Sequence, residues 1–165
     1  MSQTESVPPL VVELDVATDV DRAFSTWVDR ATLWWPPGHT MSGRPEAVVF
    51  EPKVGGRIYE RDAAGAEHTW GEVLVWDPPA RFECLWHLGF SRAEATRVAV
   101  TFTPERGTTR VRLEQTGWDA LGEAGRARCE RTVTGWTEVT DVYRAFVSRS
   151  SNESSNESNN NEVET

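Results

Sequence analysis

The chain has 165 residues, of which 38% are hydrophobic, which is enough for one domain with a buried core. Acidic residues outnumber basic ones by 26 to 17, and this balance argues against a nucleic-acid-binding protein, which needs a basic surface to contact phosphates. No stretch reaches the roughly 18 apolar residues of a membrane span, and no secretion signal is visible, so we expect a cytoplasmic protein without membrane insertion.

The two ends of the chain differ in composition from the rest. Residues 148–165 form an acidic tail of Ser, Asn and Glu in which an SSNE unit repeats and Val163 is the single apolar residue. Such a segment has nothing to bury that could offset the entropy of ordering, so we expect it to be disordered. With residues 1–8 as a flexible N-terminus, the predicted domain covers residues 9–147.

The domain is predicted to start with a strand and a helix. In PLVVELDVA, the apolar Val12, Leu14 and Val16 alternate with acidic residues, as in a half-buried strand. In TDVDRAFSTWVDRA the apolar residues follow helical spacing, and Thr18 lies three residues before Asp21 as in a capping box. Prolines at 36 and 37 end this helical region.

A meander of short strands and then a long helix make up the remainder. The predicted strands, separated by turn residues, are AVVFEP, RIYERD, HTWGEVLVW, RFECLWHL, TRVAVTFTP and TRVRLEQT. From about Asp119 to Val147 there is no proline, and Val133, Trp136, Val139, Tyr143 and Phe146 fall on one helical stripe. We therefore expect an α+β fold in which a curved antiparallel sheet wraps around a long C-terminal helix, with two short helices after the first strand.

Several motifs resemble one family in order and spacing. They are WWPPGHT, FEPKVGGRIYERDAAGAEHTWGEVLVWDPPARF, TRVRLEQTGW and GWTEV followed by YRAF. They resemble the Hsp90-ATPase-activator-homologue-like (AHSA1-like) members of the START/Bet v 1 helix-grip (SRPBCC) superfamily, over about residues 10–147. The resemblance implies a helix-grip fold, and a strongly curled sheet would leave a cavity between sheet and helix; no cofactor is expected. It does not fix a function, because the superfamily includes carriers, cyclases, hydroxylase domains and chaperone partners.

The adjacent Trp34 and Trp35 are the first candidate site residues. Successive side chains cannot both face one core on regular structure, so one of the two is expected to look toward a cavity, a partner or water. In one interpretation one ring fills the core and the other caps a corner; in the other, one ring lines the mouth of the pocket and stacks on a ligand. His39 follows the pair and is a candidate for the same mouth, with an exposed loop histidine as the alternative.

The predicted strand at residues 57–62 carries the best polar candidates, Arg57, Tyr59 and Glu60. If Glu60 faces inward with Ile58, it needs a partner or a raised pKa; if Arg57 and Tyr59 face inward, they suit an oxygen-rich ligand. A buried ion pair between sheet and helix is the structural alternative. Trp86 and Trp136 complete the candidate cavity residues.

Other chemistry is not supported by motifs. The spacings of His39, His68 and His87 match no metal site, and His87 is expected at the surface because it lies opposite Trp86 on its strand. Without a secretion signal, Cys84 and Cys129 are expected to be free thiols. No nucleophile or phosphate-loop motif occurs.

The hypothesis from the sequence is a domain that binds a small hydrophobic, aromatic or polycyclic molecule between sheet and helix. Two alternatives stay open. In the first, the protein is a cyclase-, dehydratase- or hydrolase-like enzyme acting on such a molecule, with His39, Arg57, Tyr59 or Glu60 as acid, base or oxyanion groups. In the second, it is a chaperone-associated protein-interaction module.

Overall fold

The structure is a computed structural model that describes the backbone of residues 6–161 and the side chains of residues 6–150. Its strands are β1 (Leu10–Val16), β2 (Pro45–Phe50), β3 (Arg57–Asp62), β4 (Glu67–Asp77), β5 (Arg81–Trp86), β6 (Thr96–Glu105) and β7 (Thr108–Thr116). Its helices are α1 (Val20–Asp29), α2 (Ala31–Trp34) and α3 (Ala124–Asn161), with 3-10 turns η1 (Pro37–His39), η2 (Arg92–Glu94) and η3 (Trp118–Leu121).

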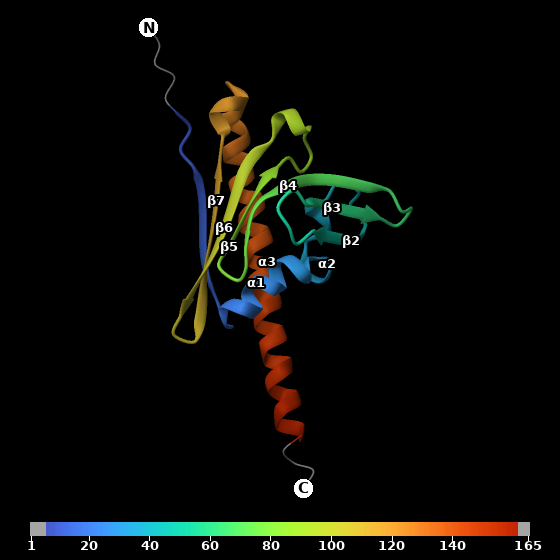
Figure 1. Cartoon of the computed structure of the whole chain (residues 1–165), viewed down its shortest axis with the longest axis vertical. Helices are drawn as coiled ribbons and strands as arrows, with labels where there is room; N and C mark the ends of the chain where they lie inside the picture. The colour runs from blue at the N-terminus through green and yellow to red at the C-terminus, as the bar shows by residue number, and fades with distance from the viewer. Residues whose placement is uncertain (1–5, 162–165) are drawn as a thin grey trace.

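All seven strands form one antiparallel sheet in the order β1-β7-β6-β5-β4-β3-β2. The sheet curls so that β2 and β3 lie across the molecule from β1, and α3 runs along the inside of the curve with α1 and α2 beside it (Figure 1). Register shifts at Ile58/Tyr59 and Val73/Val75 interrupt the pairing of β4 with its two neighbours, where bulges bend a sheet. The predicted α+β helix-grip architecture, with two short helices after the first strand, is confirmed.

Two local predictions about helices are wrong. Asp19, not Thr18, caps α1: its carboxylate accepts a hydrogen bond of 2.8 Å from the backbone N–H of Arg22, because the helix begins one residue later than the capping-box pattern indicates. Val133 is 45% exposed and does not belong to the buried stripe of α3, which consists of Trp136, Val139, Thr140, Tyr143 and Val147.

The helix α3 continues to Asn161, past the predicted domain boundary at residue 147 (Figure 1). The expectation of a disordered tail falls largely on side chains beyond residue 150 and on residues 162–165, which lie outside the described residues. Residues 1–5 of the expected flexible N-terminus also lie outside them. Both expectations stay predictions.

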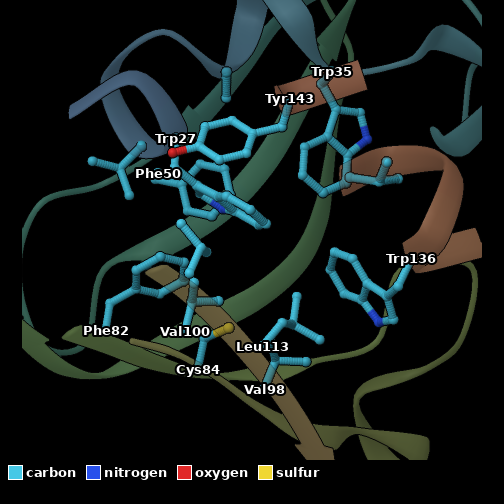
Figure 2. Close-up of a cluster of buried hydrophobic side chains, with 14 of the residues drawn as sticks. Trp27, Trp35, Phe50, Phe82, Cys84, Val98, Val100, Leu113, Trp136 and Tyr143 are labelled. Atoms are coloured by element: carbon cyan, nitrogen blue, oxygen red, sulfur yellow. The ribbon is translucent and has the colours of Figure 1, made fainter. Parts of the chain in front are cut away.

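An aromatic core joins α1, the sheet and α3. Phe24 and Trp27 of α1 meet Phe82 and Phe102 of the sheet with ring centroids 5.2–6.4 Å apart. Tyr143 lies buried on α3 among these rings (Figure 2), and its hydroxyl donates a 2.7 Å hydrogen bond to the carbonyl of Ala23, which joins α3 to α1. Burial also raises the pKa of Tyr143, so this phenol stays a hydrogen-bond donor.

The outward face of the sheet is charged. Arg110 contacts the carboxylates of Glu13, Asp15 and Glu105 at 2.9–3.4 Å, and its pKa is raised by the acids around it. Further cross-strand pairs join Arg97 to Glu83, Arg112 to Glu13 and Arg57 to Glu67. Exposed pairs of this kind stabilise a fold only slightly, but they mark this face as one that contacts water.

Candidate functional site

An aromatic cavity lies between α3, the segment around η1 and the loop that follows β5. It has a volume of about 270 Å³ and is partly open to solvent. Its lining consists of Trp35, His39, Thr40, Trp86, Leu88, Gly89, Phe90, Gln115, Arg128, Thr132, Gly135, Trp136 and Val139. The structure therefore brings together four of the eight predicted site residues, Trp35, His39, Trp86 and Trp136.

Three indole rings form the inner wall of this cavity. The centroids of Trp86 and Trp136 lie 5.2 Å apart, and Trp35 lies 5.9 Å from Trp86 and 6.2 Å from Trp136 at an interplanar angle of 86°. All three are at least 94% buried. Flat, rigid apolar walls of this kind suit a flat ligand.

Gln115 fixes the position of Trp136. Its amide oxygen accepts a 2.6 Å hydrogen bond from the indole N–H of Trp136, and its amide nitrogen donates a 2.7 Å bond to the hydroxyl of Thr96. Its backbone carbonyl also accepts a 3.0 Å bond from the indole of Trp118. The sequence signal for Gln115 was its place on the inward face of a predicted strand, after Val111 and Leu113.

His39 and Glu138 form a polar pair at the cavity mouth. The ring Nε2 of His39 lies 2.7 Å from Oε2 of Glu138 on α3, and the backbone carbonyl of His39 accepts a 3.0 Å bond from the indole of Trp35. The ring lies over Gly135, where a Cβ would meet Cε1 of His39 at 3.7 Å. The glycine therefore leaves room at the mouth of the cavity.

Arg128 is the functional candidate that sequence reasoning missed. It is 6% exposed, its Nη1 donates a 2.7 Å hydrogen bond to the carbonyl of Glu94, and its guanidinium carbon lies 3.6 Å from the ring centroid of Phe90. Burial lowers the pKa of Arg128. The available signal was helical spacing, because Arg128 lies two turns and Thr132 one turn before Trp136 on the same face.

The two adjacent tryptophans are both 4% exposed, so the expectation that only one could face the core needs correction. Trp34 ends α2 while Trp35 is extended, with φ −60° and ψ 126°, and this change in backbone lets both rings turn inward. Trp34 packs on Trp27 and Tyr143 and donates a 2.9 Å bond to the carbonyl of Thr26. Trp34 is part of the core, and Trp35 is part of both the core and the cavity wall.

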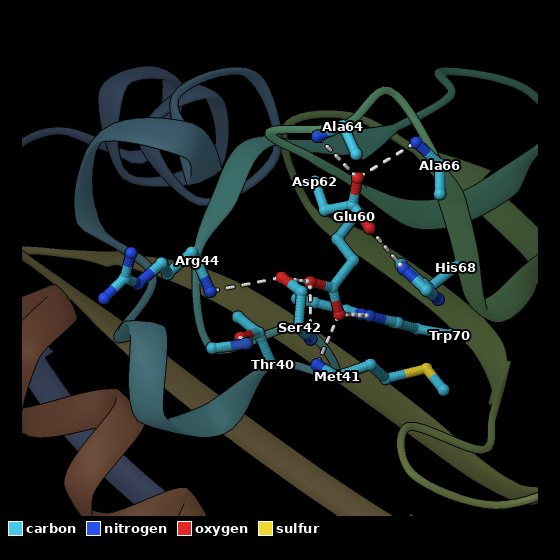
Figure 3. A network of polar contacts seen from close by, with 11 residues as sticks. Thr40, Met41, Ser42, Arg44, Glu60, Asp62, Ala64, Ala66, His68 and Trp70 are labelled. Carbon is cyan, nitrogen blue, oxygen red and sulfur yellow. Dashed lines mark hydrogen bonds and ion pairs between the residues drawn. The ribbon is translucent and has the colours of Figure 1, made fainter.

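Glu60 faces inward but lies outside the cavity. It is fully buried and accepts hydrogen bonds from the indole of Trp70 at 2.9 Å, the hydroxyl of Ser42 at 2.7 Å, and the backbone N–H groups of Met41 and Ser42 (Figure 3). Burial alone would raise the pKa of Glu60, but these hydrogen bonds outweigh it and hold the pKa below its ordinary value. The carboxylate therefore fixes the segment after η1 without an ion pair to α3.

Arg57 and Tyr59 contact each other on β3, where Arg57 is exposed and Tyr59 is buried. The guanidinium carbon of Arg57 lies 4.3 Å from the ring centroid of Tyr59, and Arg57 pairs with Glu67 at 3.2 Å. Neither residue lines the aromatic cavity. The prediction that they bind a ligand therefore draws no support from their positions.

The histidines and cysteines hold no metal site in the described part of the chain. His87, expected at the surface, is 9% exposed, because the loop after β5 folds back and places the carbonyl of Phe90 3.2 Å from its Nδ1. His68 contacts Asp62 at 3.0 Å. Cys84 and Cys129 are free thiols, as predicted.

Comparisons with known proteins agree with this architecture. The profile of the family described as "Activator of Hsp90 ATPase homolog 1-like protein" matches residues 17–148. The solution structure of CalC from Micromonospora echinospora, a self-sacrificing resistance protein, is 27% identical over 87% of this chain and 96% of its own, with a TM-score of 0.68. Txn09, described as an anthrahydroquino-gamma-pyrone synthase, is 31% identical over 78% of this chain and 88% of its own, with a TM-score of 0.52.

More distant similarity extends to the fold alone. Protein MLL2253 from Mesorhizobium loti is 20% identical over 86% of this chain and 98% of its own, with a TM-score of 0.64. A search of curated proteins finds no match. Among the described helices, none has the length and apolar character required to cross a lipid bilayer.

Proposed function

The chain belongs to the Activator of Hsp90 ATPase homolog 1-like family, and from that premise we propose that it binds a small, flat aromatic or polycyclic molecule in the cavity of about 270 Å³ beside α3. The observation that carries the proposal is the wall of three indoles, Trp35, Trp86 and Trp136, which faces a space left open rather than filled by side chains. Ligand sites are concave and mostly apolar, with few polar groups, and this cavity has that composition.

One similar protein supports the chemical class, since Txn09 is described as an anthrahydroquino-gamma-pyrone synthase. A flat polycyclic ligand would lie against the wall of three indoles in this chain. The charged outward face of the sheet gives the alternative of a protein-interaction module less support, since such a module needs an exposed apolar surface.

Conversion of the bound molecule is a second candidate function. The observation that favours it is the pair of His39 and Glu138 at 2.7 Å, since a carboxylate that holds one ring nitrogen orients the other for proton transfer. The Nδ1 atom of His39 makes no hydrogen bond to the described residues. A general base at this mouth would act on a proton of a ligand held by the indoles.

Binding is tested with a panel of naphthalene, anthracene and anthraquinone derivatives by thermal shift and calorimetry. At one hundred times the dissociation constant, a ligand should stabilise the fold by about 2.7 kcal/mol. Gly135→Leu should fill the mouth and abolish the shift, while Thr134→Leu, an exposed change on the same helix, should leave it intact. If no compound stabilises the folded wild type, the proposal is wrong.

A further inference from the structure

We propose that the ligand carries an acidic oxygen, such as a carboxylate, phenolate or enolate, and that the guanidinium of Arg128 binds it. The proposal rests on the proposed function, since it specifies the chemistry of the molecule held in the aromatic cavity. It predicts that Arg128 selects among flat apolar ligands by their charge.

Arg128 is the one buried arginine of the described residues, and no carboxylate among them lies within 4 Å of its guanidinium nitrogens, although the charge of Glu94 acts on it from farther away. The groups in direct contact with its guanidinium are the neutral carbonyl of Glu94 and the ring of Phe90. By contrast, carboxylates lie within 4 Å of the exposed Arg57, Arg61, Arg81, Arg92, Arg97, Arg110, Arg112 and Arg144. A buried charge without a counter-charge is unfavourable, so this position is costly to the free protein and is relieved by an anion.

The nearby carboxylates are held by other groups. The side chain of Glu94 accepts hydrogen bonds from the hydroxyl of Ser91 at 2.9 Å and from its backbone N–H at 3.2 Å, and these bonds lower the pKa of Glu94. Glu138 at the mouth is paired with His39. Neither carboxylate forms a direct ion pair with Arg128, and Glu94 acts on it only from beyond 4 Å, so an anion in the cavity would be the first to contact this guanidinium.

Three other polar side chains of the cavity, those of Gln115, Thr132 and Thr40, are each held by hydrogen bonds within the protein. Both amide atoms of Gln115 are bound by Trp136 and Thr96. The hydroxyl of Thr132 donates to the carbonyl of Arg128 at 2.6 Å, and that of Thr40 donates to the carbonyl of Pro37 at 2.6 Å.

The guanidinium of Arg128 carries five N–H donors, of which one is committed to Glu94. Arginine binds carboxylates through two parallel N–H bonds, which adds geometric selectivity to charge. A flat ligand that lies against Trp136 can direct an oxygen toward Arg128, because both residues line the same cavity and project from the same face of α3.

The test compares 2-naphthoate with its methyl ester, two probes of nearly the same shape that differ in charge. Calorimetry at neutral pH should show that the wild type binds 2-naphthoate at least about tenfold more tightly than the ester, since a hydrogen bond to a charged group contributes that much. In a cavity without a counter-charge the order reverses, because the carboxylate loses more hydration than the ester does.

Variants then assign the preference to Arg128. Arg128→Gln should lower the affinity for 2-naphthoate by about ten- to a hundredfold and leave the affinity for the ester unchanged. Arg128→Lys should keep part of the preference for the acid over the ester. Arg131→Gln, an exposed change one turn along α3, removes the same charge and should change neither affinity. If Arg128→Gln lacks a native circular dichroism spectrum, the ratio of the two affinities in the wild type decides.

Equal affinities for acid and ester in the wild type, or an equal loss of both in Arg128→Gln, would overturn the acidic-oxygen proposal while leaving ligand binding in place. If neither probe nor any member of the aromatic panel binds the wild type, the proposed function falls as well.

Discussion

Glu60→Gln removes one charge from a fully buried carboxylate while nearly preserving its shape. In the native protein both carboxylate oxygens accept two hydrogen bonds each: Oε1 from Met41 and Trp70, and Oε2 from the backbone and hydroxyl of Ser42. A glutamine has one acceptor oxygen, so its NH₂ group must face two donors in either orientation. The Ser42 hydroxyl can turn to accept, but the Ser42 N–H then has no partner.

The expected loss follows from that count. One buried N–H without a partner costs about 1–3 kcal/mol, and the remaining hydrogen bonds lose their charge assistance. We expect Glu60→Gln to lower the free energy of unfolding by about 2–4 kcal/mol, equivalent to roughly 5–15 °C in melting temperature for a chain of this size. Urea unfolding followed by circular dichroism measures it, with the exposed Glu46→Gln as control.

The same carboxylate predicts how stability depends on pH. Since the pKa of Glu60 is lower in the folded than in the unfolded protein, its contribution is complete above the ordinary pKa of glutamate, about 4.3, and is lost as the pH falls through the lower folded-state value. The free energy of unfolding of Glu60→Gln should therefore fall less than that of the wild type between about pH 5 and pH 3. If Glu60→Gln lowers the free energy of unfolding by less than about 0.5 kcal/mol and depends on pH as the wild type does, the reasoning about Glu60 is refuted.

Further predictions concern packing. Trp136→Ala should cost about 3–5 kcal/mol in urea unfolding, because it leaves a cavity and deprives Gln115 of a partner; a near-neutral result would mean that α3 does not cover the sheet. Gly71→Ala should lower the free energy of unfolding by at least about 2 kcal/mol, because the new Cβ would lie 2.0 Å from the carbonyl oxygen of Leu85. Gly135→Ala should instead stabilise α3 by up to about 1 kcal/mol, and equal urea midpoints for the two variants would contradict both expectations. Truncation after Ser150 removes no core residue and should change the melting temperature by less than about 2 °C; a larger loss would show that the tail docks.

The fold could be predicted from the sequence because its signals are local. Alternation in the strands and helical spacing in the helices each depend on a few neighbouring residues, as for the alternating Leu14 and Val16, which are buried in the structure. The motifs around Gly55, Trp70 and Asp77 then fixed the family. Gly71, within one of these motifs, also has a structural reason, since no side chain fits where β4 approaches Leu85.

The site was harder to predict because it depends on contacts between distant segments. Arg57 and Glu60 belong to the same short strand, and only the bulge between Ile58 and Tyr59 and the partners of each side chain decide their environment. The pairing of His39 with Glu138 joins residues 99 positions apart. Arg128 was passed over because its segment resembled no catalytic motif, although its helical spacing to Trp136 was visible.

The tryptophan wall also has an optical consequence. A continuous series of indoles leads from the core to the cavity, with successive centroids 5.1–5.9 Å apart: Trp27, Trp34, Trp35, Trp70, Trp86 and Trp136. Rings this close exchange electronic excitation before they emit, so light absorbed by any of them can reach the ring beside the cavity. A quinone bound against Trp136 would then quench the emission of the whole series, and the fluorescence of this protein would respond to its ligand as that of a single large chromophore.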